Sequence, residues 1–143
     1  MVYLDYERYK AHYLDAQAQY ERILIEQSEL FERTQPKGIR YDTDRVTSSK
    51  TGNAFDSYLI EKERLKIDER LKEAKKLLEG RLYLLNQKER ELRISRDLAD
   101  TIYRMRFIDR KRIWRVAKET GYSEAQVYRI IQKINLSIKD ARK

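Results

Sequence analysis

The segment from Ser123 to Lys139 carries arginine and glutamine side chains whose hydrogen-bonding groups match the edges of DNA bases. An arginine guanidinium donates two hydrogen bonds to guanine, and a glutamine amide pairs with adenine through one donor and one acceptor. Arg129 suits the first role, and Gln126 or Gln132 suits the second. The helix face expected to contact bases holds Glu124, Ala125, Gln126, Tyr128, Arg129, Gln132 and Lys133.

Basic residues on both sides of Ser123 have the charge to bind the DNA backbone. Lysine and arginine bind phosphate oxygens whatever the base sequence, and a hydroxyl adds a hydrogen bond. A charged run is also often only a solvated face, as Lys88–Glu91 is expected to be in this chain. The residues expected to contact phosphate are Arg110, Lys111, Arg112, Arg115, Lys118, Ser123 and Lys139.

Three residues have the spacing of a helix-turn-helix. Ala117 is small enough for two helices to cross, Gly121 accepts the positive φ of a tight turn, and Val127 points back from the second helix. Ser123 and Gln126 match a capping box, which would leave Gln126 less available to a base. The expected core of the module comprises Phe107, Ile113, Trp114, Ala117, Gly121, Val127 and Ile131.

These residues require three helices in the C-terminal segment, residues 93–143. The first is expected over roughly Arg96–Phe107, and the second over Arg110–Glu119 with Asp109 as its cap. The third begins after Ser123. In a helix-turn-helix this last helix enters the major groove of double-stranded DNA.

The charge of the chain is concentrated in the same segment. The net charge is +8, yet residues 1–92 carry 18 basic and 18 acidic side chains. Residues 93–143 therefore hold the whole excess, with 14 basic and 6 acidic side chains. A neutral part joined to a basic module is typical of a protein that meets phosphate at one end and protein at the other.

Residues 1–33 have the alternating three- and four-residue spacing of an amphipathic helix, with Gln27 as the one polar interruption. Tyrosine occupies many of the apolar positions, and each phenol must stay near water or find a partner. A shallow seam packed on the second long helix is therefore expected, with a tyrosine-rich binding surface as the alternative. The seam comprises Tyr6, Tyr9, Tyr13, Ala16, Tyr20, Ile23 and Leu30.

Residues 57–92 predict a second long helix, which folds back on the first as an antiparallel coiled-coil-like hairpin. Gly80 in the middle suggests a close crossing or a break. The apolar stripe comprises Ile60, Ile67, Leu71, Ala74, Leu78 and Leu85. Off this stripe lie Leu59, Leu77, Leu82 and Tyr83, which suggest contact with a second copy of the chain.

Residues 34–56 lose the helical spacing and contain the only proline, so they are expected to form a linker loop. Asn53 is a candidate N-cap for the helix that follows. The expected organisation is thus an all-α chain: helix 1–33, linker 34–56, helix 57–92 and a helix-turn-helix domain over 93–143.

The composition argues against enzymes and membrane proteins. The chain has no cysteine, and His12 is its one histidine, so we expect no metal site, no cofactor and no catalysis. No apolar run approaches the roughly 18 residues of a membrane span, and the N-terminus lacks the apolar core of a signal peptide. We expect a cytoplasmic protein without a membrane partner.

The segment MRFIDRKRIWRVAKETGYSEAQVYRIIQKI resembles region 4 of sigma-70-type factors. The matching positions are Phe107, Ile108, Ala117, Gly121, Ser123, Val127 and Ile131.

The linker and the helix after it are similar to the middle of small phage regulators of late transcription of the RinA and ArpU kinds. Their V-x-S-S/T-x-x-G-like stretch is matched by Val46, Ser48, Ser49 and Gly52. The resemblance covers about residues 38–138. It implies an activator of late genes of a phage or mobile element, acting near RNA polymerase in a bacterial host cell.

The chain departs from that pattern at Arg110–Arg112, where sigma-like modules more often have glycine and a polar cap. Promoter contacts are therefore not carried over. The tyrosine-rich first helix has no counterpart in the resemblance.

Three functions fit these observations. The first is a sequence-specific transcription regulator that forms a homodimer through the long helices. The second is a small-terminase-like or terminase-redirecting DNA-packaging protein, which joins a helix-turn-helix to oligomerisation helices and meets a phage packaging protein. The third is an adaptor whose basic end contacts an acidic protein. A footprint with paired half-sites would favour the first.

Overall fold

The computed structural model describes residues 1–34 and 50–142, which form helices and turns without a strand. The expected all-α class is confirmed. The elements are α1 (Val2–Thr34), α2 (Lys50–Ile94), α3 (Leu98–Tyr103), the π-helix η2 (Arg104–Ile108), α4 (Ile113–Thr120) and α5 (Glu124–Ala141). They form two compact units: the head unit, Met1–Leu14 with Gly80–Lys143, and the arm unit, Asp15–Glu79.

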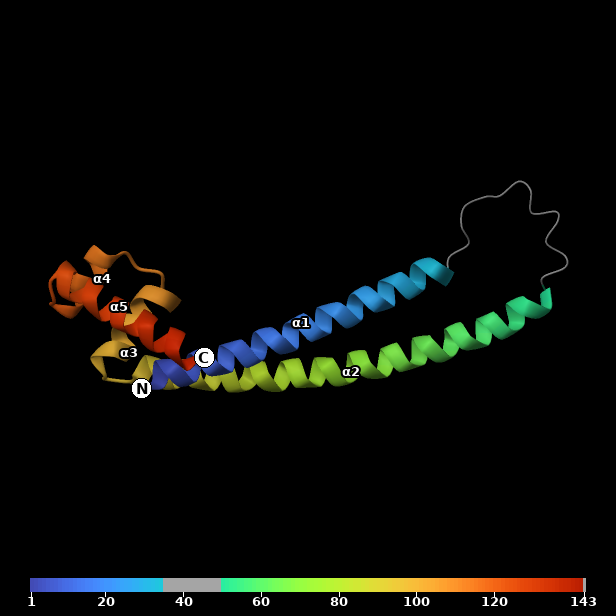
Figure 1. The fold of residues 1–143 in the computed structure, drawn as a ribbon. Helices are drawn as coiled ribbons and strands as arrows, with labels where there is room; N and C mark the ends of the chain where they lie inside the picture. Colours follow the sequence, from blue (N-terminus) through green and yellow to red (C-terminus); the bar gives the residue numbers. More distant parts are fainter. Residues whose placement is uncertain (35–49, 143) are drawn as a thin grey trace. The chain divides into compact units, whose positions relative to one another are not determined.

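The arm unit is an antiparallel pair of helices, with α1 lying along α2 (Figure 1). Its core is small: Ile23 and Leu30 of α1 are buried against Ile67 of α2. Polar pairs flank this core, and one that links the two helices joins Arg70 to Glu26 at 2.7 Å. Because both partners of that pair are about half exposed, it adds little to stability compared with the apolar contacts.

The apolar seams expected on the two long helices do face each other within each unit. On α1, Ala16, Ile23 and Leu30 are buried, while the seam tyrosines are half-buried. On α2, Ile67, Leu85 and Leu92 are buried. The off-stripe residues remain exposed, and these are Leu59, Leu77, Leu82 and Tyr83.

Helix α2 begins at Lys50, so its start is three residues before the expected cap at Asn53. Of the expected linker 34–56, residues 35–49 lie outside the described residues, and so do Val46, Ser48 and Ser49 of the resemblance. The helix passes through Gly80 without interruption, and a Cβ placed there would meet nothing within 4 Å. The expectation of a break or a close crossing at Gly80 is therefore wrong.

The head unit has the larger core. Figure 1 shows α3, α4 and α5 gathered beside the start of α1 and the end of α2. The core draws on each of these elements, and its members are Tyr3, Leu92, Ile102, Tyr103, Met105, Val116, Ala117, Val127, Ile131 and Ile134. The three-helix module thus shares its core with the start of α1 and the end of α2.

The first helix of this module is shorter than expected and changes its winding. Instead of one helix over Arg96–Phe107, α3 ends at Tyr103 and η2 continues it. The Asp109 N–H donates to the Arg104 carbonyl at 2.9 Å, which is the five-residue spacing of a π-turn. The Phe107 ring stacks on Tyr103 with centroids 4.9 Å apart, and 37% of Phe107 stays exposed. Phe107 therefore lies at the edge of the core rather than inside it.

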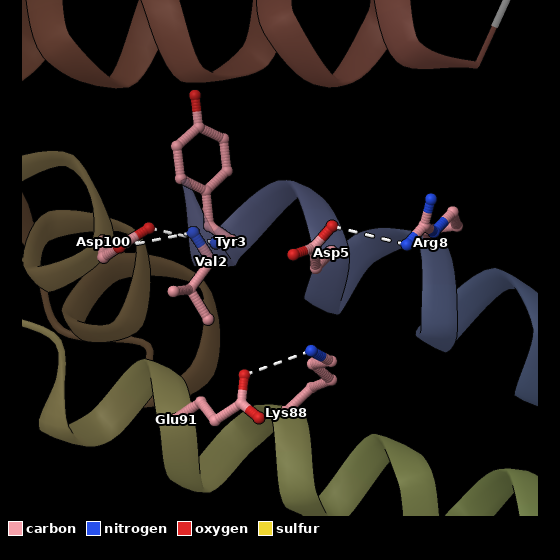
Figure 2. Close-up of polar contacts among 7 residues, drawn as sticks. All are labelled: Val2, Tyr3, Asp5, Arg8, Lys88, Glu91 and Asp100. Carbon is pink, nitrogen blue, oxygen red and sulfur yellow. Dashed lines mark hydrogen bonds and ion pairs between the residues drawn. The ribbon is translucent and has the colours of Figure 1, made fainter.

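The start of α1 is capped by a buried side chain from α3. Asp100 is 1% exposed, and its carboxylate accepts hydrogen bonds from the backbone N–H of Tyr3 at 3.0 Å and of Val2 at 3.4 Å (Figure 2). The Ser95 hydroxyl donates to the same carboxylate at 2.7 Å. The first N–H groups of a helix have no partner within that helix, and a carboxylate there also suits the helix dipole.

A second polar contact joins the same elements beside this cap. The Tyr103 hydroxyl donates to the Glu7 carboxylate, which also pairs with Arg142 at 3.2 Å. Burial, and then the hydrogen bond to Glu7, raises the pKa of Tyr103 well above its usual range. The ring of Tyr103 stacks on Tyr3 with centroids 5.4 Å apart. These contacts connect the first two turns of α1 to both ends of the C-terminal module.

Candidate nucleic-acid interface

The turn between α4 and α5 has the geometry of a helix-turn-helix. Gly121 has φ 78° in the left-handed region, and its N–H donates to the Ala117 carbonyl at 2.9 Å. Ala117 and Val127 are buried where the two helices meet, at 7% and 0% exposed. A residue with a Cβ would be strained at Gly121, so the glycine permits the abrupt change of direction.

Helix α5 begins with the capping box. The Ser123 hydroxyl accepts from the Gln126 N–H at 3.2 Å, and the Gln126 Oε1 accepts from the Ser123 N–H at 3.1 Å. The amide oxygen of Gln126 is therefore occupied, and a bidentate contact with adenine would have to break the box. Gln132, which has no role in the cap, is the better candidate for adenine.

The seven residues expected to contact bases are all exposed. Around α5, Val127, Ile131 and Ile134 face the core, and Arg129 and Gln132 lie on the opposite side. Lys133 differs from them because it lines a hollow with α3. That hollow has a volume of about 560 Å³, and Leu98, Ala99, Ile130 and Ile134 are among its other lining residues.

Leu136 is an apolar residue on the exposed side of α5, and it was not predicted from the sequence as a contact residue. Leu136 is 61% exposed and follows Arg129 and Gln132 at helical spacing. The four-residue step from Gln132 was the available signal. Leucine at this position offers a contact surface for a thymine methyl or for a protein.

Of the seven expected phosphate contacts, Arg110, Lys111 and Arg112 were predicted within the second helix but precede α4 in the structure. Arg110 and Lys111 precede α4 in a loop, and Arg110 has φ 55°, which is uncommon for a residue other than glycine. Helix α4 begins after Arg112, whose backbone is its N-cap. Arg112, Arg115, Lys118, Ser123 and Lys139 are exposed.

One acidic residue reduces the charge that is available to DNA. Glu119 pairs with Lys111 at 2.7 Å and with Arg115 at 3.6 Å. The hydrogen bond from Lys111 is the largest cause of the lowered pKa of Glu119, and Arg115 acts in the same direction. Arg110, Arg112 and Lys118 are the basic residues near α4 that this carboxylate does not engage.

Two further expectations are corrected by the structure. Trp114 is 53% exposed on α4, so it is not a core residue; the neighbouring Val116 and Ala117 fill that position instead. Asp109 does not cap α4, because it follows η2 and pairs with Arg93 at 3.6 Å. Residues 109–112 form a loop after η2, so α4 starts three residues later than predicted, at Ile113. Ile113 itself is half-buried against the core.

The residues that join α1 to this module, Tyr3 and Asp100, were also not predicted from the sequence. Tyr3 extends the three-residue step back from Tyr6, so the periodicity contained a signal for it. Asp100 had no such signal, since a lone acidic residue in a polar stretch resembles any solvated one. Only the fold shows that it is buried.

No protein-family model, curated protein or solved structure matches the chain. Among the described residues, no helix has both the length and the apolar character needed to cross a bilayer. Any assignment of function therefore depends on the geometry of α4, α5 and the residues around them.

Proposed function

We propose that this chain binds double-stranded DNA through α5 and acts as a transcription regulator. The observation that carries the proposal is the orientation of α5. Its apolar side is fixed in the core by Val127 and Ile131, and Arg129 and Gln132 are exposed on the other side. A helix held in this way by a tight turn fits the major groove, where those two side chains can distinguish guanine and adenine.

The distribution of charge supports the same proposal. All of the +8 net charge lies in residues 93–143, and basic residues flank both ends of the turn. Arg112 and Lys118 are exposed on α4, and Lys139 is exposed in the last turn of α5. Such contacts supply affinity that depends on the salt concentration. They also position the reading helix without selecting a sequence.

The proposal includes a homodimer formed through the long helices. Leu59 and Leu77 are 43% and 42% exposed and lie about five helical turns apart on the same face of α2, within the arm unit. Covering this apolar row with a second copy would place two α5 helices on half-sites one DNA turn or a multiple of it apart. A regulator of this kind, such as a late-gene activator of a phage or mobile element, would act in the cytoplasm of a bacterial host beside RNA polymerase.

The test recovers DNA bound by the full chain from genomic fragments and measures affinity for an enriched site at several salt concentrations. We expect enrichment at promoters, and Arg129→Ala should weaken specific binding by about 5- to 150-fold, the effect of about 1–3 kcal/mol. The exposed Arg90→Ala on α2 is the matched control and should bind as the parent does. Enrichment at a packaging-initiation site would replace regulation by DNA packaging, and the absence of any enriched site would refute sequence-specific regulation.

A further inference from the structure

Trp114 is the only tryptophan of the chain, and it lies at the start of α4 with 53% of its surface exposed. A tryptophan ring is a large apolar surface with one hydrogen-bond donor, so it is normally covered when an apolar core is near. Here the core side of α4 is filled by Val116 and Ala117, at 0% and 7% exposed. The Trp114 ring therefore lies on the solvent-exposed side of α4.

The surroundings of the ring are basic. Lys118 follows Trp114 by one helical turn, so the two side chains lie on one face, whereas Arg115 pairs with Glu119 at 3.6 Å. The one acidic residue of α4 is Glu119, and Lys111 binds it at 2.7 Å. An exposed ring on the same helix face as a lysine suits a partner that carries both negative charge and apolar groups. An apolar protein surface would bury the charge of the lysine without a partner.

We propose that Trp114 contacts the backbone of bound DNA, with its ring packed on a deoxyribose and its Nε1–H donating to a phosphate oxygen. The inference depends on the proposed function, since it assigns α4 the role that the first helix of a helix-turn-helix has when it crosses the DNA backbone. It adds a contact of different chemistry to the charged residues. An indole donor positions the helix by direct hydrogen bonding, whereas Lys118 acts through its charge.

Tryptophan fluorescence tests this contact directly, because the signal comes from one ring. The full chain is titrated with a duplex that it binds, and the emission and its quenching by acrylamide are recorded alongside the anisotropy of labelled DNA. We expect the emission to change with the same midpoint as the anisotropy and the accessibility to acrylamide to fall. Rising protein concentration without DNA should leave the emission unchanged.

Variants provide the second measurement. Trp114→Ala should weaken binding roughly three- to tenfold, the size of one net hydrogen bond, and Trp114→Phe should fall between it and the parent. Tyr58→Ala removes a similarly exposed ring on α2, 64% exposed, and should not change the affinity. Because Trp114 is outside the core, the helical circular dichroism of its variants should match that of the parent.

Each outcome has a distinct meaning. If DNA binds and Arg129→Ala weakens it, but the emission and the affinity of Trp114→Ala are unchanged, the inference fails and the proposed function stands. An emission change that follows protein concentration alone would mean that the ring contacts a second copy, which also overturns the inference. If no duplex binds at any salt concentration, both the inference and the proposed function fail.

Discussion

The carboxylate of Asp100 accepts a hydrogen bond from the backbone N–H of Tyr3 at 3.0 Å, across 97 positions of the chain. A helix start is usually capped by the residue just before it. Here the cap for α1 comes from α3, and the carboxylate is buried at 1% exposed. The first turn of α1 is therefore a structural part of the C-terminal module.

Asp100→Ala should lower the free energy of unfolding by about 1–3 kcal/mol. The substitution leaves the buried Val2 and Tyr3 N–H groups and the Ser95 hydroxyl without their acceptor. Urea denaturation followed by circular dichroism measures the change.

Asp97→Ala is the matched control, because it removes the same charge three residues earlier. Asp97 is exposed at the start of α3, and its side chain makes no capping hydrogen bond. We expect a change within about 0.5 kcal/mol. An equal loss from both substitutions would show that charge, rather than the cap of α1, determines the effect.

Two glycine-to-alanine substitutions should have opposite signs. Gly121→Ala forces a Cβ into a backbone with φ 78° and should destabilise the head unit by about 1 kcal/mol. Gly80→Ala, inside α2, should stabilise the chain by up to about 1 kcal/mol because alanine is the better helix former. Neither Cβ would meet an atom within 4 Å, so backbone preference alone sets both results. Thermal and urea unfolding measure them, and a shift of the same sign in both would contradict the prediction.

The capping box should behave as one cooperative unit. Ser123→Ala and Gln126→Ala each remove one of its two side chain to backbone hydrogen bonds, at a cost of about 1 kcal/mol for the serine. A double-mutant cycle should show that the combined loss differs from the sum of the single losses. If Gln126→Ala weakens DNA binding far more than it lowers stability, Gln126 contacts a base instead of serving only the cap.

Alkaline pH should destabilise the head unit through Tyr103. Burial and the hydrogen bond to Glu7 raise the pKa of its hydroxyl, while in the unfolded chain the group ionises near its ordinary pKa of 10.0. The stabilisation is therefore complete below pH 10 and is lost as the pH rises above it, at about 1.4 kcal/mol per pH unit for one proton. Urea midpoints between neutral pH and pH 11 (about one unit above that value) measure this slope.

Tyr103→Phe should make that slope shallower, although it also lowers the stability at neutral pH. The slope that remains should include Tyr6, whose pKa is raised first by burial and then by Glu89. Tyr128→Phe changes a tyrosine that is 52% exposed and should keep the slope of the parent. An unchanged slope in Tyr103→Phe would show that another group causes the alkaline loss.

The residues with strong local signals were predictable from the sequence. The spacing of Ile23, Leu30 and Ile67 indicated the paired long helices, and the types of residue at Gly121 and Ser123 indicated the turn and the start of α5. These signals arise because helix periodicity and turn geometry depend on neighbours within a few positions.

The errors fell where distant contacts decide the structure. Trp114 was expected in the core, but α4 begins three residues later than predicted, and Val116 and Ala117 occupy the core instead. Asp100 and Tyr3 meet only in the folded chain. A base contact by Arg129 stays a prediction, because it depends on a partner that the chain itself does not encode.

The long connection between Tyr3 and Asp100 has a consequence during synthesis. At about 5–20 residues per second, the ribosome adds Asp100 roughly 5–20 s after Tyr3. Until then the Tyr3 ring, 2% exposed in the finished fold, has none of its α3 partners to cover it. The head unit can therefore close only after α3 has been synthesised, and the first turn of α1 must remain without its cap for seconds.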